Sequence, residues 1–155
     1  MAFRTFDWHS LALTAVSSTL LAGPANAAPA IALDSAVYVE REQPGNIRRL
    51  EPANQLSRGD RIIMIVTWQR LDGPGGNGGG FVVTNPLPRS VYFQRSANGD
   101  EEVSADGGRS WGRIGTLRYG MRLATPEDVT HVRWRVPADR AAAGRGQIAY
   151  SGIVR

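Results

Sequence analysis

The stretch Val129-Thr130-His131-Val132-Arg133-Trp134-Arg135-Val136 alternates apolar and polar side chains with a period of two. Successive side chains of a β-strand point to opposite faces, so this period predicts a strand with one buried and one solvated face. The valines and Trp134 are expected to face a core, whereas His131 and the two arginines are expected to face solvent. A helix, with its period of 3.6 residues, would not give this pattern.

The rest of the chain carries similar short runs. Residues 61–68 are apolar on both faces through their first half, which predicts a central strand covered on both sides. Further strands are predicted from β-branched and aromatic content at residues 36–42, 47–50, 81–84, 90–95, 101–105, 115–119 and 147–154. The only helical window, residues 139–143, is too short to stand alone. About seven to nine strands at near-regular spacing predict an all-β fold, an antiparallel β-sandwich.

Turn residues separate these runs. Gln43-Pro44-Gly45-Asn46 is suited to a hairpin turn, and Pro86 and Pro88 must end the strand before them because proline donates no ladder hydrogen bond. Residues 71–80 hold six glycines, which predicts the longest flexible loop of the chain.

The N-terminus has the order of a secretory signal peptide. Arg4 precedes an apolar stretch at residues 11–22, Gly23-Pro24 break it, and Ala25-Asn26-Ala27 offers small residues to a peptidase. We predict cleavage after Ala27, a flexible segment at residues 28–35, and the sandwich domain at residues 36–155. The apolar stretch is too short for a membrane span, and no second one follows. The product is expected to be exported, periplasmic or extracellular.

Composition excludes several function classes. The 155 residues include no cysteine, so disulfide frameworks and thiolate sites are excluded. The net charge is +4, and all 18 basic residues are arginines, which are scattered along the chain with Arg48-Arg49 as the only adjacent pair. This scatter favours a solvated basic surface over a nucleic-acid-binding one. A weak attraction to anionic envelope polymers is an open alternative.

Several segments, taken in order, resemble a known family. Arg58-Gly59-Asp60-Arg61-Ile62-Ile63-Met64 places Gly-Asp before an apolar strand, and Phe81-Val82-Val83-Thr84-Asn85-Pro86-Leu87-Pro88 places a strand before two prolines. Both are similar to segments of a conserved repeat domain of unknown function in prokaryotic cell-surface proteins, an immunoglobulin-like β-sandwich. Residues 104–108 and 128–134 further resemble a small single-domain exported subgroup in proteobacteria.

The resemblance spans roughly Val37 to Arg155 and implies an immunoglobulin-like fold and a cell-surface location. The family has no established activity or catalytic residues, so none is implied here. Residues 71–80 depart from the family, which tends to have a shorter asparagine-glycine turn at this place.

Ser104-Ala105-Asp106-Gly107-Gly108-Arg109-Ser110-Trp111 resembles the Asp-box, a self-contained hairpin. In such a turn the aspartate accepts backbone and hydroxyl hydrogen bonds, a glycine takes a conformation closed to other residues, and the tryptophan covers the turn. The structural turn residues are therefore Ser104, Asp106, Gly108, Ser110 and Trp111. As an alternative, Trp111, Asp106 and Arg109 could bind a carbohydrate, with calcium as a further possibility.

The sequence offers few residues that are suited to catalysis. His131 is the only histidine after the predicted cleavage, so a histidine metal site is not expected. Asp128, the acid nearest to it in sequence, would leave the opposite face of an extended strand, which argues against a serine triad. Arg58-Gly59-Asp60 spells the integrin tripeptide but is better explained as a turn. No enzyme activity, cofactor or metal is predicted.

The leading hypothesis is an exported, non-enzymatic β-sandwich with a structural or protein-interaction role in the envelope. The alternative is a small carbohydrate-binding module that uses exposed aromatics near the Asp-box-like hairpin, which requires a tyrosine beside Trp111. A third hypothesis is a hydrolase using Glu101 and Asp106. The partner, an envelope protein or polysaccharide, and the oligomeric state are left open.

Overall fold

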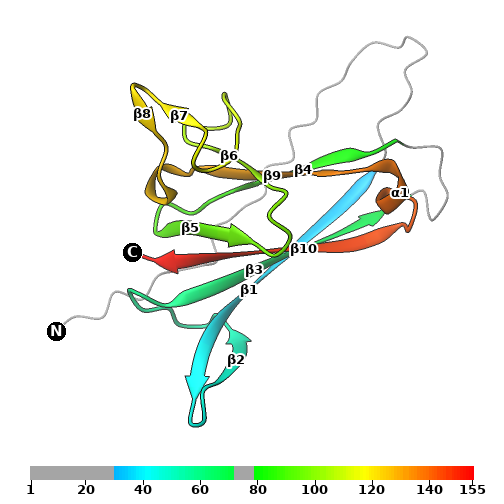
Figure 1. Cartoon of the computed structure of the whole chain (residues 1–155). Coiled ribbons are helices and arrows are strands. Elements are labelled where there is room, and N and C mark those ends of the chain that lie inside the picture. Colours follow the sequence, from blue (N-terminus) through cyan, green and yellow to red (C-terminus); the bar gives the residue numbers. More distant parts are fainter. Residues whose placement is uncertain (1–29, 72–78) are drawn as a thin grey trace.

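The structure is a computed structural model that describes residues 30–71 and 79–155. The predicted signal peptide and most of the predicted glycine-rich loop lie outside the described residues. The described chain forms two larger antiparallel sheets and a separate two-stranded antiparallel ribbon (Figure 1). The larger has the strand order β2 (Ile47–Pro52), β1 (Ile31–Gln43), β3 (Arg61–Arg70), β10 (Arg145–Val154) and β5 (Val91–Ser96). The smaller has the order β4 (Phe81–Pro86), β9 (His131–Val136) and β6 (Glu102–Ser104). The predicted all-β sandwich is confirmed.

Strand β9 shows the alternation that predicts the fold. Val132, Trp134 and Val136 are 0%, 3% and 2% exposed, whereas Arg135 on the other face is exposed. These three side chains belong to the hydrophobic core between the sheets, where they meet Ile62, Met64, Val66 and Trp68 of β3. The core thus comes from the inner faces of both sheets, as the period of two requires.

Strand β3 is central, as predicted, but the prediction that both of its faces are covered is wrong. Met64 and its neighbours on the inner face are buried, whereas Ile63 and Ile65 on the outer face are only half-buried. The smaller sheet packs against the inner face alone. An outer face with partly exposed isoleucines therefore remains on the five-stranded sheet.

The predicted flexible N-terminal segment needs correction over its described part. Residues 31–35, expected to be flexible, form the first part of β1, where Ile31 pairs with Arg70 and Leu33 with Trp68 of β3. The ladder with β3 satisfies the backbone groups of this segment, which residue-type content alone did not indicate.

The predicted strand at residues 115–119 is also wrong over most of its length. Gly115 has a φ of +87°, and the backbone N–H groups of Thr116 and Leu117 bond back to the carbonyl of Arg113, which makes a turn. Only Arg118–Tyr119 (β7) is extended, and it pairs with Arg122–Leu123 (β8). Among residues 30–71 and 79–155, the helical elements are η2 (Pro126–Asp128), a 3-10 turn, and α1 (Ala138–Ala141).

Candidate functional site

The Asp-box-like segment folds into a turn that uses its own polar groups. The Asp106 carboxylate accepts hydrogen bonds from Ser104 Oγ at 2.8 Å and from the backbone N–H groups of Arg109 and Ser110 at 3.0 and 2.9 Å. Ser104 Oγ in turn accepts from the N–H of Gly108, whose φ is +89°, a conformation that favours glycine. The hydrogen bonds to the carboxylate, from Ser110 above all, hold the pKa of Asp106 well below its ordinary value. The Asp106 carboxylate is therefore occupied by hydrogen bonds within its own turn.

The Trp111 side chain also interacts with neighbouring residues of the domain. Its Nε1 donates to the carbonyl of Gly108 at 2.8 Å, and the Arg133 guanidinium lies 4.3 Å from its ring centroid. Arg133 donates from Nε to Glu102 at 2.8 Å, so an ion pair holds the guanidinium over the ring. In the part of the chain that the structure describes, no tyrosine ring contacts Trp111. Of the three residues suggested for carbohydrate, only Arg109 offers an exposed polar side chain that has no hydrogen bond or ion pair with a described residue.

The acids and the histidine considered for catalysis are kept apart. Asp128 accepts two hydrogen bonds from Arg122, at 2.6 and 2.7 Å, whereas His131 Nδ1 contacts Thr130 Oγ1 at 3.1 Å. Glu101 binds the backbone N–H and the hydroxyl of Ser96, outside the turn that holds Asp106. Among residues 30–71 and 79–155, no group of three or more metal-ligating side chains occurs.

The integrin-like tripeptide forms a turn. Gly59 has a φ of +89°, and Asp60 accepts hydrogen bonds from the backbone N–H of Ser57 at 2.7 Å and from Arg41 at 2.6 Å. Its carboxylate is therefore used to tie the turn to β1.

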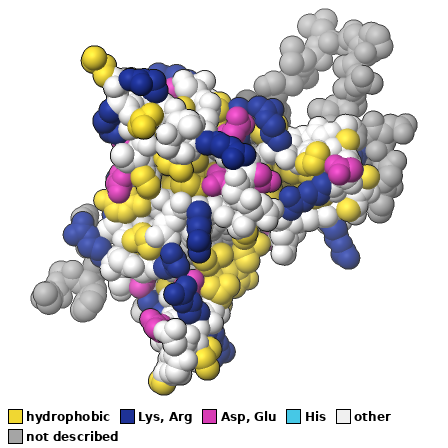
Figure 2. Space-filling model, viewed as in Figure 1, with side chains coloured by type: hydrophobic (Ala, Val, Ile, Leu, Met, Phe, Trp, Pro, Cys, Tyr) yellow, Lys and Arg dark blue, Asp and Glu magenta, His cyan; other side chains and the backbone are white. Residues whose placement is uncertain are grey.

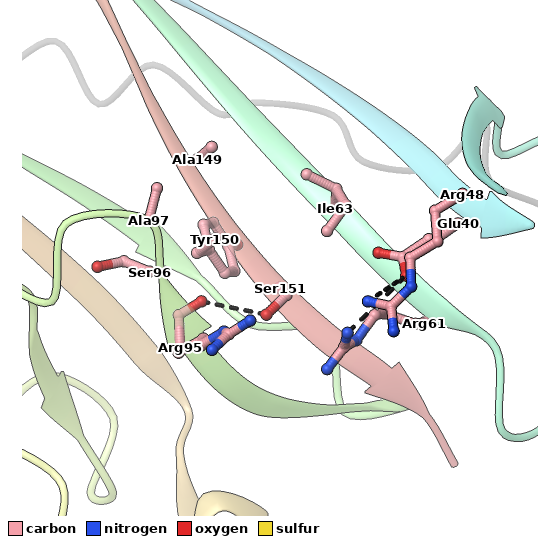
Figure 3. Close-up of a pocket in the computed structure, with 10 residues that line it drawn as sticks. All are labelled: Glu40, Arg48, Arg61, Ile63, Arg95, Ser96, Ala97, Ala149, Tyr150 and Ser151. Carbon is pink, nitrogen blue, oxygen red and sulfur yellow. Dashed lines mark hydrogen bonds and ion pairs between the residues drawn. The ribbon is translucent and has the colours of Figure 1, made fainter. Parts of the chain in front are cut away.

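A different site lies on the outer face of the five-stranded sheet (Figure 3). It is a shallow pocket of about 190 Å³ that extends from β1 and β2 across β3 and β10 to β5. Its floor is made of small and aliphatic side chains, and its rim is charged. The residues that define this arginine pocket are Arg48, Arg61, Arg95, Glu40, Ile63, Ala97, Ala149 and Ser151, with Ser96 and Tyr150 completing the lining.

A β-bulge shapes the β5 side of the pocket. Ser151 of β10 pairs with Arg95, but the next residue, Gly152, pairs with Phe93, so Gln94 has no partner in the register. Without this extra residue, side chains 93 and 95 would share one face. With it, Phe93 is buried in the core while Gln94 and Arg95 both reach the outer face.

Charges in the pocket are only partly balanced. Glu40 forms ion pairs with Arg48 at 3.2 Å and with Arg61 at 3.8 Å. Arg61 Nε also donates to Gln94 Oε1 at 3.0 Å, which fixes the guanidinium beside the bulge. The exposed Arg95 side chain makes no hydrogen bond or ion pair with any described residue. Three arginines against one glutamate leave the pocket with an excess of positive charge.

The space-filling view agrees with this description. Figure 2 shows basic side chains one after another across the five-stranded sheet, with an area of hydrophobic side chains next to them. These arginines are 13 and 34 residues apart in the sequence (48, 61 and 95), so their convergence depends on strand order and register. The sequence interpretation of a scattered, solvated arginine surface missed this site.

Comparisons with protein-family models, with curated proteins and with solved structures found no match to this chain. The resemblance to the cell-surface repeat family therefore stays a prediction. Over the described residues, no helix is both long and apolar enough to cross a membrane.

Proposed function

We propose that this chain is an exported, non-enzymatic binding domain that recognises an acidic envelope polysaccharide through the arginine pocket. The observation that carries the proposal is the convergence of Arg48, Arg61 and Arg95 from three strands on one sheet face, with Glu40 as the single acid among the described lining residues. Guanidinium groups bind carboxylates through paired, charge-assisted hydrogen bonds, which are stronger than neutral ones. Arg95 has these donors available.

The form of the pocket supports a polymer as the ligand. The pocket is shallow and lies on a sheet face, and its floor of Ile63, Ala97 and Ala149 offers apolar contact to one side of a sugar ring. A polysaccharide with one carboxylate per repeat could lie across the strands and place successive charges near the arginines. The predicted signal peptide supports an envelope location, in agreement with the leading hypothesis from the sequence.

The hairpin at residues 104–111 is a weaker candidate for the same class of ligand. The Asp106 carboxylate already accepts hydrogen bonds from within its own turn, and the Arg133 guanidinium covers a face of the Trp111 ring. We therefore place carbohydrate binding at the arginine pocket instead of at the exposed aromatics near the hairpin, which the sequence offered as the alternative hypothesis.

Isothermal titration with polygalacturonate, a polymer of uronic acids, tests the proposal. We expect binding that weakens as salt is added, and no binding to dextran, a neutral glucose polymer. Removing one charge-assisted contact with Arg95→Ala should lower the affinity about tenfold or more.

Arg109→Ala is the matched control, because Arg109 is equally an exposed arginine without a described side-chain partner but lies on the hairpin. We expect this variant to bind within about twofold of the parent protein, since a distant surface charge contributes little. If Arg109→Ala loses binding and Arg95→Ala does not, the hairpin is the site. Equal binding to poly-glutamate would identify an acidic protein as the partner, and no binding to any polyanion would refute the proposal.

A further inference from the structure

Strand β2 is an edge strand with one open side. It pairs with β1 over Ile47–Pro52, and no other described strand lies along its far edge. Figure 1 shows the β1–β2 hairpin projecting from the end of the five-stranded sheet. Ile47 is 61% exposed and Leu50 is 46% exposed, so this edge presents apolar side chains as well as unpaired backbone groups. Such an edge is a template for pairing with another strand.

Strand β2 carries three charged side chains. Arg48 is bound to Glu40, but Arg49 and Glu51 form no ion pair with any described side chain. These two residues are separated by Leu50, and both point to the face opposite to that of Leu50. The edge therefore carries a free positive charge and a free negative charge on one face, with an exposed leucine between them on the other.

This pattern is self-complementary in one register. When two copies of a strand pair antiparallel about a two-fold axis normal to the sheet, each residue faces one whose sequence number differs by an even amount. A two-fold axis beside Leu50 places Leu50 of one chain opposite Leu50 of the other. It also places Arg49 of each chain opposite Glu51 of the other chain, so two pairs of opposite charges form. An axis at Arg49 or at Glu51 places like charges opposite each other, which is destabilising.

We propose that β2 is a self-association edge, through which two copies of this chain pair antiparallel about Leu50. The pairing joins the two five-stranded sheets into one continuous sheet, with leucine against leucine on the outer face and two Arg49–Glu51 ion pairs on the other face. Pro52 lacks an N–H and ends β2, so the ladder covers residues 48–52 of each copy.

Sedimentation velocity of the purified protein over a range of concentrations tests this pairing. We expect the parent protein to shift from monomer to dimer as its concentration rises. Arg49→Glu and Glu51→Arg each place like charges opposite one another and should raise the dissociation constant about tenfold or more. The double variant Arg49→Glu/Glu51→Arg restores opposite charges in the same register and should recover association.

Arg145→Glu serves as the control, because Arg145 is exposed and lies where β10 pairs with Gln69 at the far end of β3. It should associate like the parent protein. All the substituted side chains lie outside the core, and circular dichroism checks that each variant keeps its strands. A parent protein that stays monomeric at every concentration, or a dimer that Arg49→Glu does not weaken, would overturn the proposal. Failure to recover in the double variant would refute the Leu50 register.

Discussion

At the scale of single residues, Asp106 stabilises its turn as an anion. Hydrogen bonds, the strongest from Ser110, lower its pKa, so the folded chain binds fewer protons than the unfolded chain once the pH falls below about 4. The stabilisation is complete above the unfolded pKa and is lost as the pH falls toward the folded one. Asp106→Asn should therefore have a lower Tm at neutral pH and a smaller further loss of Tm between about pH 5 and pH 2.

Thermal unfolding followed by circular dichroism at several pH values measures this difference. Asp100→Asn is the matched control, because Asp100 is an exposed aspartate in a neighbouring turn without a hydrogen bond to any described residue. Its curve of Tm against pH should follow that of the parent protein. Parallel curves for Asp106→Asn and the parent protein would mean that the turn does not depend on an ionised carboxylate.

At the scale of the elements, β9 buries in the core the apolar face that its alternating sequence predicts. Val132 has no exposed surface, whereas the Arg135 side chain on the opposite face is 67% exposed. Val132→Ala removes buried methyl groups and leaves a cavity, so we expect the free energy of unfolding to fall by about 2 kcal/mol. Arg135→Ala should change it by no more than about 0.5 kcal/mol. Urea denaturation of both variants gives these values, and equal losses would contradict the one-sided burial of β9.

The same strand shows how far the sequence can predict the molecule. Alternation within β9 depends only on local spacing, so its buried face follows from the amino-acid sequence alone. The Asp-box-like turn is predictable in the same way, because Asp106 bonds within four residues of itself in the chain. The arginine pocket is not, since Arg95 reaches the outer face only through the bulge at Gln94, and nothing in the residue types marks that shift in register.

At the scale of the whole molecule, the two proposals together make a further prediction. Because a two-fold axis normal to the sheet keeps each face on its own side, both arginine pockets of a β2-paired dimer open to the same side. A long polyuronate can then occupy both pockets at once, whereas a short oligomer occupies one. Arg49 lies outside the pocket lining. Arg49→Glu should therefore weaken binding of long polygalacturonate, which needs the dimer, but leave binding of digalacturonate unchanged.

Titration calorimetry with the two ligands tests this bivalent binding. If both ligands bind Arg49→Glu as they bind the parent protein, the pockets act independently, even if each proposal holds by itself. If both ligands bind more weakly, Arg49 contributes to binding directly and not through pairing.

The central claim is that the outer sheet face, and not the hairpin, binds the acidic ligand. Nuclear magnetic resonance spectra of the ¹⁵N-labelled protein, recorded while digalacturonate is added, locate the ligand directly. We expect the largest shifts at the backbone amides of Arg61, Arg95 and Ser151, which line the pocket, with those of Gly107 and Trp111 unmoved. Shifts concentrated at residues 104–111, with the outer face unchanged, would contradict the claim.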